Sequence, residues 1–185
     1  MLAHDTDNSP EQMSPYPPFS LPLAEQKLSR PFHDLLDYWH QIRGRHPIPL
    51  KQDFDPFAIS DLLPCLILFE VLRNRESLDF RFRVVGTYLD ERHNGCYTGS
   101  TVTEVYGNNH GQIWHACENV AQTATPELAQ FPFTGQARLA KEERITSVNA
   151  LFLPLSEQGG LVDYILCLVN FKHAAGADRQ TGHPA

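Results

Sequence analysis

Strand-like segments on either side of a helical stretch constrain the fold of this chain most strongly. Three of them cover residues 65–72, 78–87 and 161–171. In the second, apolar and charged residues alternate from Asp79 to Val84. This period of two residues is typical of a strand in a sheet with one face covered by helices and the other face exposed to solvent. The last segment is apolar on both faces and is therefore expected to be a central strand. With a further late strand, these segments predict an antiparallel sheet that closes over helices, a cup able to hold a small ligand.

The remaining elements follow from periodicity and from turn residues. A first helix is expected after Ser29 and ends near Gly44, and a short second helix spans residues 55–63. The spacing of Ile113, Ala116, Cys117 and Val120 predicts a longer helix. A third strand is expected within residues 127–133. The fourth spans 144–155 and joins the last strand, 161–171, through a glycine-containing loop suited to a hairpin.

One apolar stripe on the first helix needs a partner surface. It recurs at helical spacing, so it must be covered either by the sheet of the same chain or across a twofold interface with a second copy. The second possibility is the hypothesis of a homodimer through this helix. The residues of the stripe are Phe32, Leu35, Leu36, Trp39 and Ile42.

The two ends of the chain differ in composition from its middle. Residues 1–28 carry five prolines among polar residues and are expected to be a disordered arm. Residues 174–185 have no apolar periodicity and are expected to be a flexible tail. A single domain is therefore predicted over residues 29–173.

Charge and composition exclude several functional classes. The chain has 185 residues, of which 42% are apolar, and a formal net charge of -7, which disfavours a nonspecific nucleic-acid binder. No secretory signal is evident, and the longest apolar runs, of about five residues, fall far short of the ~20 needed to span a membrane. The four cysteines form no CxxC pair, which fits reduced thiols in a cytoplasm.

Several short motifs together resemble the PAS domain family, and more narrowly a bacterial subfamily of stand-alone PAS proteins. They are, in order, D-Y-W at 37–39, D-P-x-x-I at 55–59, L-L-P at 62–64, F-R-x-V-G-T at 82–87, T-G at 98–99 and L-x-L-P-L at 151–155. The similarity covers about residues 32–171.

The resemblance implies an α+β fold with a five-stranded antiparallel sheet in the order 2-1-5-4-3, helices on one face and an added N-terminal helix. It also implies a non-catalytic sensory or regulatory module, which senses a small ligand, redox state or light and relays the signal by contacts with a separate signalling protein or a second copy. The cofactor, if there is one, is unknown.

A set of side chains is predicted to line the cup and to bind the ligand. By resemblance to haem-binding PAS proteins, His110 is a candidate axial ligand of haem. The alternative is that His110 lies just before the helix, where its side chain is hydrogen-bonded or solvated. The tryptophan either stacks on a ligand or closes the core. The set is Leu89, Tyr97, Val102, His110, Trp114, Cys117, Phe152 and Leu166.

Other reactive side chains are not expected to bind a cofactor or a metal. Cys96 lies near the position of the flavin-reactive cysteine in light-sensing relatives, but the surrounding HNGCYTG differs, and no flavin is predicted. One arc of the first helix, opposite the apolar stripe, carries His33, Asp37 and His40. We expect this arc to face solvent, and no metal site is predicted there.

Two other functions compete with the sensor. One is a small α+β-cone enzyme of the ketosteroid-isomerase type, which needs a buried carboxylate such as Glu91, Glu104 or Asp163. No hydrolase, nucleotide-binding or metalloprotease motif is present, and no catalytic residue is predicted. The other is a ligand-free protein interaction module whose core is filled by its own side chains.

Overall fold

The computed structural model describes residues 28–74, 77–93, 96–107, 111–132 and 145–173. The predicted arm and tail lie outside these residues, except for Leu28. Four α-helices are described, α1 (Arg30–Arg43), α2 (Thr87–His93), α3 (Val102–Tyr106) and α4 (Gly111–Thr123). Two 3-10 helices, η2 (Lys51–Asp53) and η3 (Pro56–Cys65), precede the first strand.

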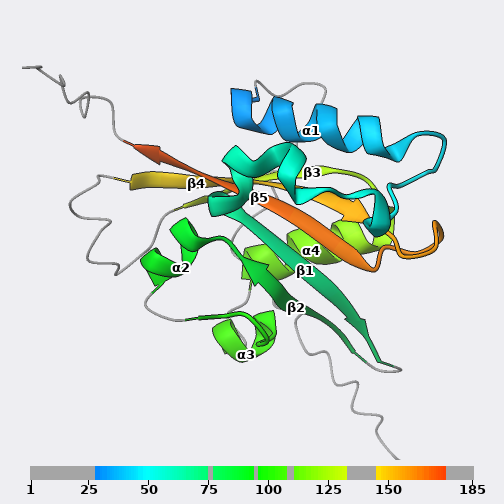
Figure 1. The fold of residues 1–185 in the computed structure, drawn as a ribbon. Helices are drawn as coiled ribbons and strands as arrows, with labels where there is room; N and C mark the ends of the chain where they lie inside the picture. The colour runs from blue at the N-terminus through cyan, green and yellow to red at the C-terminus, as the bar shows by residue number, and fades with distance from the viewer. Residues whose placement is uncertain (1–27, 75–76, 94–95, 108–110, 133–144, 174–185) are drawn as a thin grey trace, which may run out of the picture.

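Five antiparallel strands form one sheet in the order β2-β1-β5-β4-β3 (Figure 1). They are β1 (Leu66–Arg73), β2 (Leu78–Val85), β3 (Glu127–Pro132), β4 (Ile145–Leu155) and β5 (Tyr164–His173). This is the strand order that the resemblance implied. The last strand is central, as its apolar pattern predicted, with four consecutive buried residues from Ile165 to Leu168.

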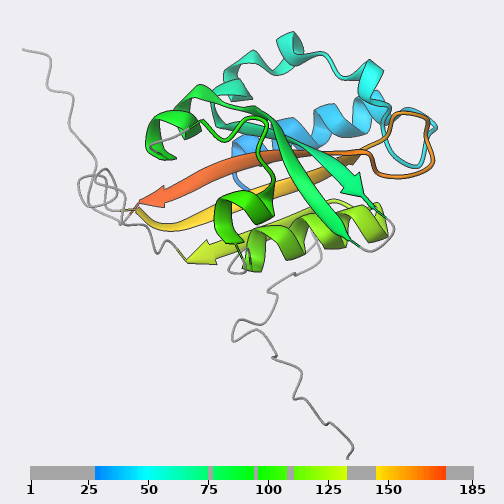
Figure 2. The same ribbon diagram turned by 90° about the horizontal axis from the view of Figure 1, so that it is seen from below.

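Helices cover both faces of the sheet (Figure 2). One face is covered by α4, which contacts β2, β3, β4 and β5, while α1 contacts β4 on the opposite face and η3 contacts β5. Because successive side chains of a strand point to opposite faces, neighbouring residues of β5 enter different hydrophobic layers. The sheet therefore separates two cores.

The apolar stripe of α1 is covered within the chain. Phe32, Leu35 and Trp39 are buried, and Leu36 and Ile42 are half-buried. The covering surface consists of β4 and η3, the elements that α1 contacts. Within the described residues, a dimer through this stripe would have only the two half-buried side chains left to share, and it stays a prediction.

A β-bulge alters the facing of residues at the end of β2. Phe82 pairs with Phe69, but Val84 pairs with Leu68, so one extra residue, Arg83, is inserted into β2. Such a bulge exchanges the faces of the residues beyond it. Val84 is consequently 54% exposed, and the expectation that it continues the covered face of Phe80 and Phe82 is wrong.

Gly86, directly after β2, brings the chain into close contact with the end of η3. A Cβ atom at this position would lie 2.3 Å from the carbonyl oxygen of Pro64 and 2.4 Å from that of Leu63. The Gly86 amide donates a 2.7 Å hydrogen bond to the carbonyl oxygen of Leu66. The V-G-T motif therefore uses glycine because any side chain would displace η3 from the sheet.

Candidate functional site

The candidate site is the face of the sheet that α3 and α4 cover. Its orientation is fixed by the contact of Phe80 with Trp114 of α4, whose ring centroids are 5.8 Å apart. Strand partners share a face, so Ile67, Phe69 and Val71 of β1 lie on the same side as Phe80 and Phe82. These strand side chains form the floor of the predicted cup.

The floor continues across the central strands. Cys167 of β5 pairs with Ile67 of β1 on one side and with Phe152 of β4 on the other. Phe131 of β3 then contacts Phe152, with ring centroids 6.3 Å apart. All five strands therefore contribute to one continuous apolar surface, which α4 crosses with its buried residues Ala116, Cys117 and Val120.

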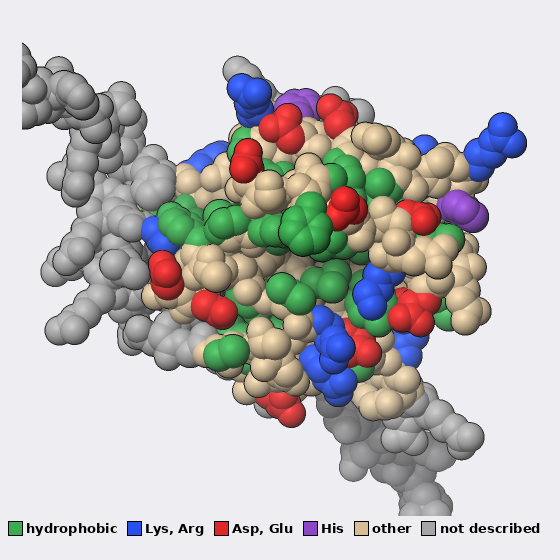
Figure 3. Space-filling view, in the orientation of Figure 1, with side chains coloured by type: hydrophobic (Ala, Val, Ile, Leu, Met, Phe, Trp, Pro, Cys, Tyr) green, Lys and Arg blue, Asp and Glu red, His purple; other side chains and the backbone are tan. Residues whose placement is uncertain are grey.

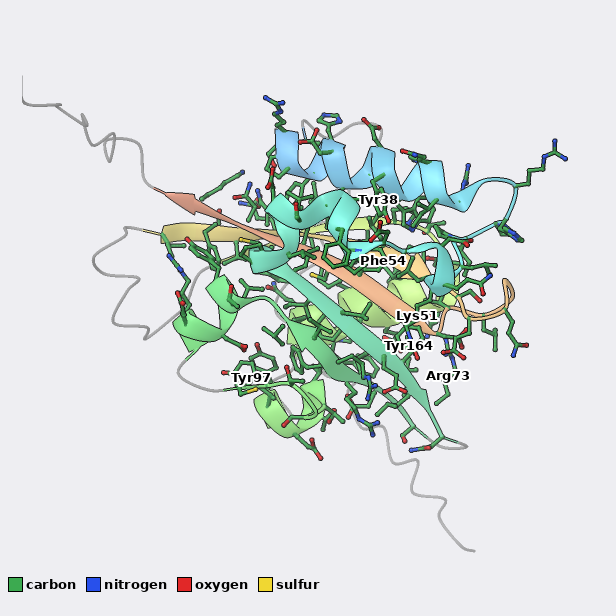
Figure 4. All side chains as sticks on the ribbon, viewed as in Figure 1. Tyr38, Lys51, Phe54, Arg73, Tyr97 and Tyr164 are labelled. Carbon is green, nitrogen blue, oxygen red and sulfur yellow. The ribbon has the colours of Figure 1, made fainter. Side chains whose placement is uncertain are left out.

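A row of aromatic rings leads from this floor to the surface. Phe69 contacts Phe82 at a centroid distance of 4.9 Å, Phe82 contacts Tyr97 at 5.7 Å, and Tyr97 contacts Tyr106 at 6.4 Å. Phe69 and Phe82 are buried, whereas Tyr106 is 36% exposed. The two tyrosines therefore form the rim of the cup beside α3, where Figure 4 labels Tyr97.

The rim is fixed by hydrogen bonds at the start of α3. The Thr101 hydroxyl accepts from the Glu104 amide at 3.2 Å, and the Glu104 carboxylate accepts from the Thr101 amide at 2.8 Å. This reciprocal capping box satisfies two amide groups that a helix start leaves unpaired. The segment before it is attached to β2, because the Phe82 amide donates to the Ser100 carbonyl oxygen and the Gly99 amide to that of Phe82.

Three protic groups of the cup remain uncharged near neutral pH. Burial raises the pKa of Tyr106 from its ordinary 10.0 to about 12, and the nearby Tyr97 and Cys167 add to this shift. Burial also raises the pKa of Cys117, with smaller contributions from Cys167 and Glu127, and burial raises the pKa of Cys167. The influence of a buried thiol on Tyr106 indicates that the tyrosine hydroxyl lies on the inner side of the rim.

The structure brings most of the predicted lining residues to this site. Tyr97 lies at the rim, Trp114 and Cys117 lie on α4, and Phe152 lies on the floor. Val102 is buried on α3, which contacts β2. Among the other predicted residues, Leu89 is buried on α2, the helix that contacts η3, and His110 lies outside the described residues.

Leu166 does not lie on this face. It pairs with Leu68 of β1 and Leu153 of β4, whereas Phe152 pairs with Cys167. Leu166 and Phe152 therefore point to opposite sides of the sheet, and Leu166 belongs to the layer on the side of α1. Cys167 occupies the position on β5 that the prediction gave to Leu166.

The other candidates of the sequence lie elsewhere. Cys96 is exposed, and so are His33, Asp37 and His40 on the outer face of α1. Of the three carboxylates considered for an enzyme, Glu91 is exposed and Glu104 is engaged in the capping box. Asp163 accepts from the Glu157 amide at 2.8 Å in the β4–β5 connection. None of these three is a buried carboxylate of the cup.

Several important site residues were missing from the prediction. Phe80 and Phe82 were recognised as a covered strand face but were not assigned to the lining. Tyr106 is not among the predicted lining residues, although Thr101 and Glu104, spaced as in a capping box, mark the start of the helix that carries it. Cys167 was missed because the sequence does not fix which face of β5 meets Phe152.

The comparisons with known proteins agree with this architecture. A family model described as PAS domain matches residues 28–170. The chain therefore belongs to the PAS domain family. This membership supports a sensory or regulatory module in general. No curated protein and no solved structure matches the chain. Within the described residues, no helix has both the length and the apolar character needed to cross a membrane.

Proposed function

We propose that this PAS domain is a non-catalytic sensory module that takes a small uncharged ligand into the cup and relays its presence through contacts with a separate signalling protein. The observation that supports this proposal best is the combination of aromatic rings with the protonated Tyr106, Cys117 and Cys167. Aromatic faces favour a flat ligand, and hydroxyl and thiol groups give it hydrogen-bond partners without charge.

The position of the two tyrosines supports a route to the cup. Tyr97 and Tyr106 are in contact with each other and stand between the buried floor and solvent. A ligand that displaced either ring would reach Phe82 next, because Phe82 contacts Tyr97. We also assign the protein to the cytoplasm, since all four cysteines are free thiols, which fits a reducing compartment.

The first test is an absorption spectrum of the purified protein together with native mass spectrometry for copurified molecules. A visible band or an added mass that disappears on unfolding is the expected result for a ligand-bound sensor. Thermal unfolding with indole as an uncharged aromatic probe then tests the colourless protein, because a ligand that binds only the folded state raises the melting temperature.

Matched variants decide whether binding occurs in the cup. Phe152 and Leu153 are adjacent on β4, and both have exposed fractions of 0%, but they point to opposite faces. Phe152→Ala should change the affinity for the copurified ligand or indole several-fold or more, while Leu153→Ala should leave it unchanged. An equal effect of both variants would argue against the cup as the site.

A ligand-free interaction module is the second candidate function. It is favoured by the dense filling of the site, since Phe69, Phe82, Cys117 and Phe152 are all buried by other side chains. A colourless protein without added mass and without a response to indole in either variant would support this second function.

A further inference from the structure

The surface formed by η3 and β2, on the face opposite the cup, carries exposed apolar side chains. Phe57 of η3 is 86% exposed and Val84 of β2 is 54% exposed. Val84 pairs with Leu68, which in turn pairs with Leu166, so it points to the face on which η3 lies. The contact of Gly86 with the carbonyl groups of Leu63 and Pro64 places the end of η3 beside the end of β2.

Figure 3 shows this face of the molecule, with hydrophobic side chains in a band across its middle and basic side chains gathered below the band. Exposed apolar groups that cluster on one face of a protein commonly mark an interaction surface. Large apolar side chains with such exposure are few among the described residues, and the other two are Tyr106 at the rim and Leu161 in the β4–β5 connection.

The two halves of this surface carry opposite charges. Residues 54–65 contain the exposed carboxylates of Asp55 and Asp61 and no lysine or arginine. The β2 half contains Arg81 and Arg83, whose side chains are 38% and 53% exposed. The η3 half is therefore acidic and apolar, and the β2 half is basic and apolar.

The arginines of β2 have unused hydrogen-bonding capacity. Arg81 Nη1 lies 3.3 Å and Arg83 Nε 3.9 Å from the same oxygen, Oε2 of Glu70. Two guanidinium groups thus share one carboxylate oxygen, and each guanidinium has five N–H donors in a fixed geometry. The group of three carries a net positive charge and can accept a further carboxylate.

We propose that this face is a twofold interface between two copies of the chain, with η3 of one copy packed on β2 of the other. In such an isologous interface residue i of one subunit contacts residue j of its partner, and j contacts i. The apolar Phe57 then meets the apolar Val84, and Asp61 lies near Arg83, in both halves at once.

A second copy fits this face better than an unrelated partner of one charge. A uniformly acidic partner would complement β2 but repel η3, and a basic partner would do the reverse. The two halves complement each other, yet within the described residues no ion pair joins the η3 carboxylates to Arg81 or Arg83 in the same chain. The α1 stripe offers less to a partner, because Phe32, Leu35 and Trp39 are already buried.

Sedimentation equilibrium of the full chain over a range of concentrations tests this proposal. The expected result is a reversible dimer whose dissociation constant rises about tenfold or more in Phe57→Ser and in Val84→Ser, because each loses an apolar contact at the interface. Leu161→Ser is the matched control, since Leu161 is 67% exposed but lies outside the surface. Its dimerisation should equal that of the unaltered chain.

Charge reversal supplies a second, sharper test. Asp61→Arg alone and Arg83→Glu alone should each be monomeric, because both contacts in their homodimers join like charges. An equimolar mixture of the two variants should form a heterodimer, in which the introduced arginine faces the introduced glutamate and the unaltered Arg83 faces the unaltered Asp61. The substituted side chains are exposed, so thermal unfolding should show folded proteins in each case.

A strictly monomeric chain at all concentrations would overturn this proposal, and so would a dimer that persists unchanged in Phe57→Ser and Val84→Ser. A mixture of the charge variants that stays monomeric would also count against the pairing of η3 with β2. These outcomes leave the sensory function untouched, because the cup lies on the other face and is tested by ligand binding.

Discussion

The indole Nε1 of Trp39 donates a 2.8 Å hydrogen bond to the carbonyl oxygen of Pro154, 115 residues further along the chain. Strand β3 begins at Glu127, opposite Phe152, so Pro154 has no strand partner on that side. The first helix therefore supplies a hydrogen bond that the sheet cannot, and it does so from a side chain that is 2% exposed.

Trp39→Phe should lower the free energy of unfolding by about 1–3 kcal/mol, because the buried carbonyl group of Pro154 loses its donor. Urea unfolding followed by circular dichroism measures the effect. Gln41→Ala, at an exposed position of the same helix, is the control and should change stability by less than about 0.5 kcal/mol. An unchanged stability of Trp39→Phe would contradict the role given to the indole.

Gly86→Ala should destabilise the fold by about 2 kcal/mol or more, since its Cβ would require a backbone shift of η3. Thermal and chemical unfolding provide the measurement. In the matched variant Gly160→Ala the new Cβ meets nothing within 4 Å, and little change is expected. Equal effects of the two substitutions would show that η3 can move away from β2 at low cost.

Removal of the capping box should loosen the rim of the cup. Thr101→Ala deletes the acceptor of the Glu104 amide and should cost about 0.5–2 kcal/mol. Amide hydrogen exchange should increase over α3, while α1 keeps its protection. Thr103→Ala, at an exposed position of the same helix, keeps the box and serves as the control.

Stability should fall as the pH rises through the alkaline range. The pKa of Tyr106 is about 12 in the folded protein and near 10.0 when unfolded, so the unfolded chain releases its proton first. The stabilising contribution is fully present below pH 10 and is lost as the pH rises towards 12. The raised thiol pKa values of Cys117 and Cys167 act in the same direction, beginning near pH 9.0.

Spectroscopic titration of phenolate formation checks this assignment. In Tyr106→Phe the most alkaline tyrosine ionisation step should be smaller, and the decline in stability between pH 10 and 12 should be shallower. Tyr38→Phe, on the face opposite the cup, is the comparison variant (Figure 4). If Tyr106→Phe titrates like the unaltered chain, the tyrosine hydroxyl is not buried in the rim.

Truncation of Phe152 and truncation of Leu153 should disturb different layers of the protein, although both variants lose stability. Phe152→Ala should cost about 3–5 kcal/mol and Leu153→Ala about 2–5 kcal/mol, because each leaves a cavity. Fluorescence of Trp114, which contacts the cup residue Phe80, should change in Phe152→Ala. Emission of Trp39 should change in Leu153→Ala, so single-tryptophan backgrounds separate the two layers.

The sequence predicted the order and type of the main elements because their periodicities are local. Strand β5 shows apolar residues on both faces, which only a central strand explains, and α4 carries its buried residues at helical spacing. The short loop between β4 and β5 predicted that these two strands pair with each other. These features need no knowledge of distant contacts.

The facing of individual strand residues could not be predicted in the same way. Val84 depends on the bulge opposite Leu68 and Phe69, which has no signature in a plain alternation of residues. Leu166 and Cys167 are both apolar and buried, and only pairing with Phe152 decides which one faces the cup. A shift of a single residue exchanges the two faces, and the structure accordingly places Phe152 of β4, but not Leu166 of β5, on the face of the cup.

The central strand β5 contributes side chains to both cores, and this has a mechanical consequence. Cys167 packs in the cup, and its neighbours Leu166 and Leu168 pack in the layer on the side of α1. A displacement of β5 on one side of the sheet therefore compresses or loosens the packing on the other side. Close-packed interiors have low compressibility and transmit such strain. A molecule that enters the cup would therefore alter the seating of α1 on the opposite face without touching that helix.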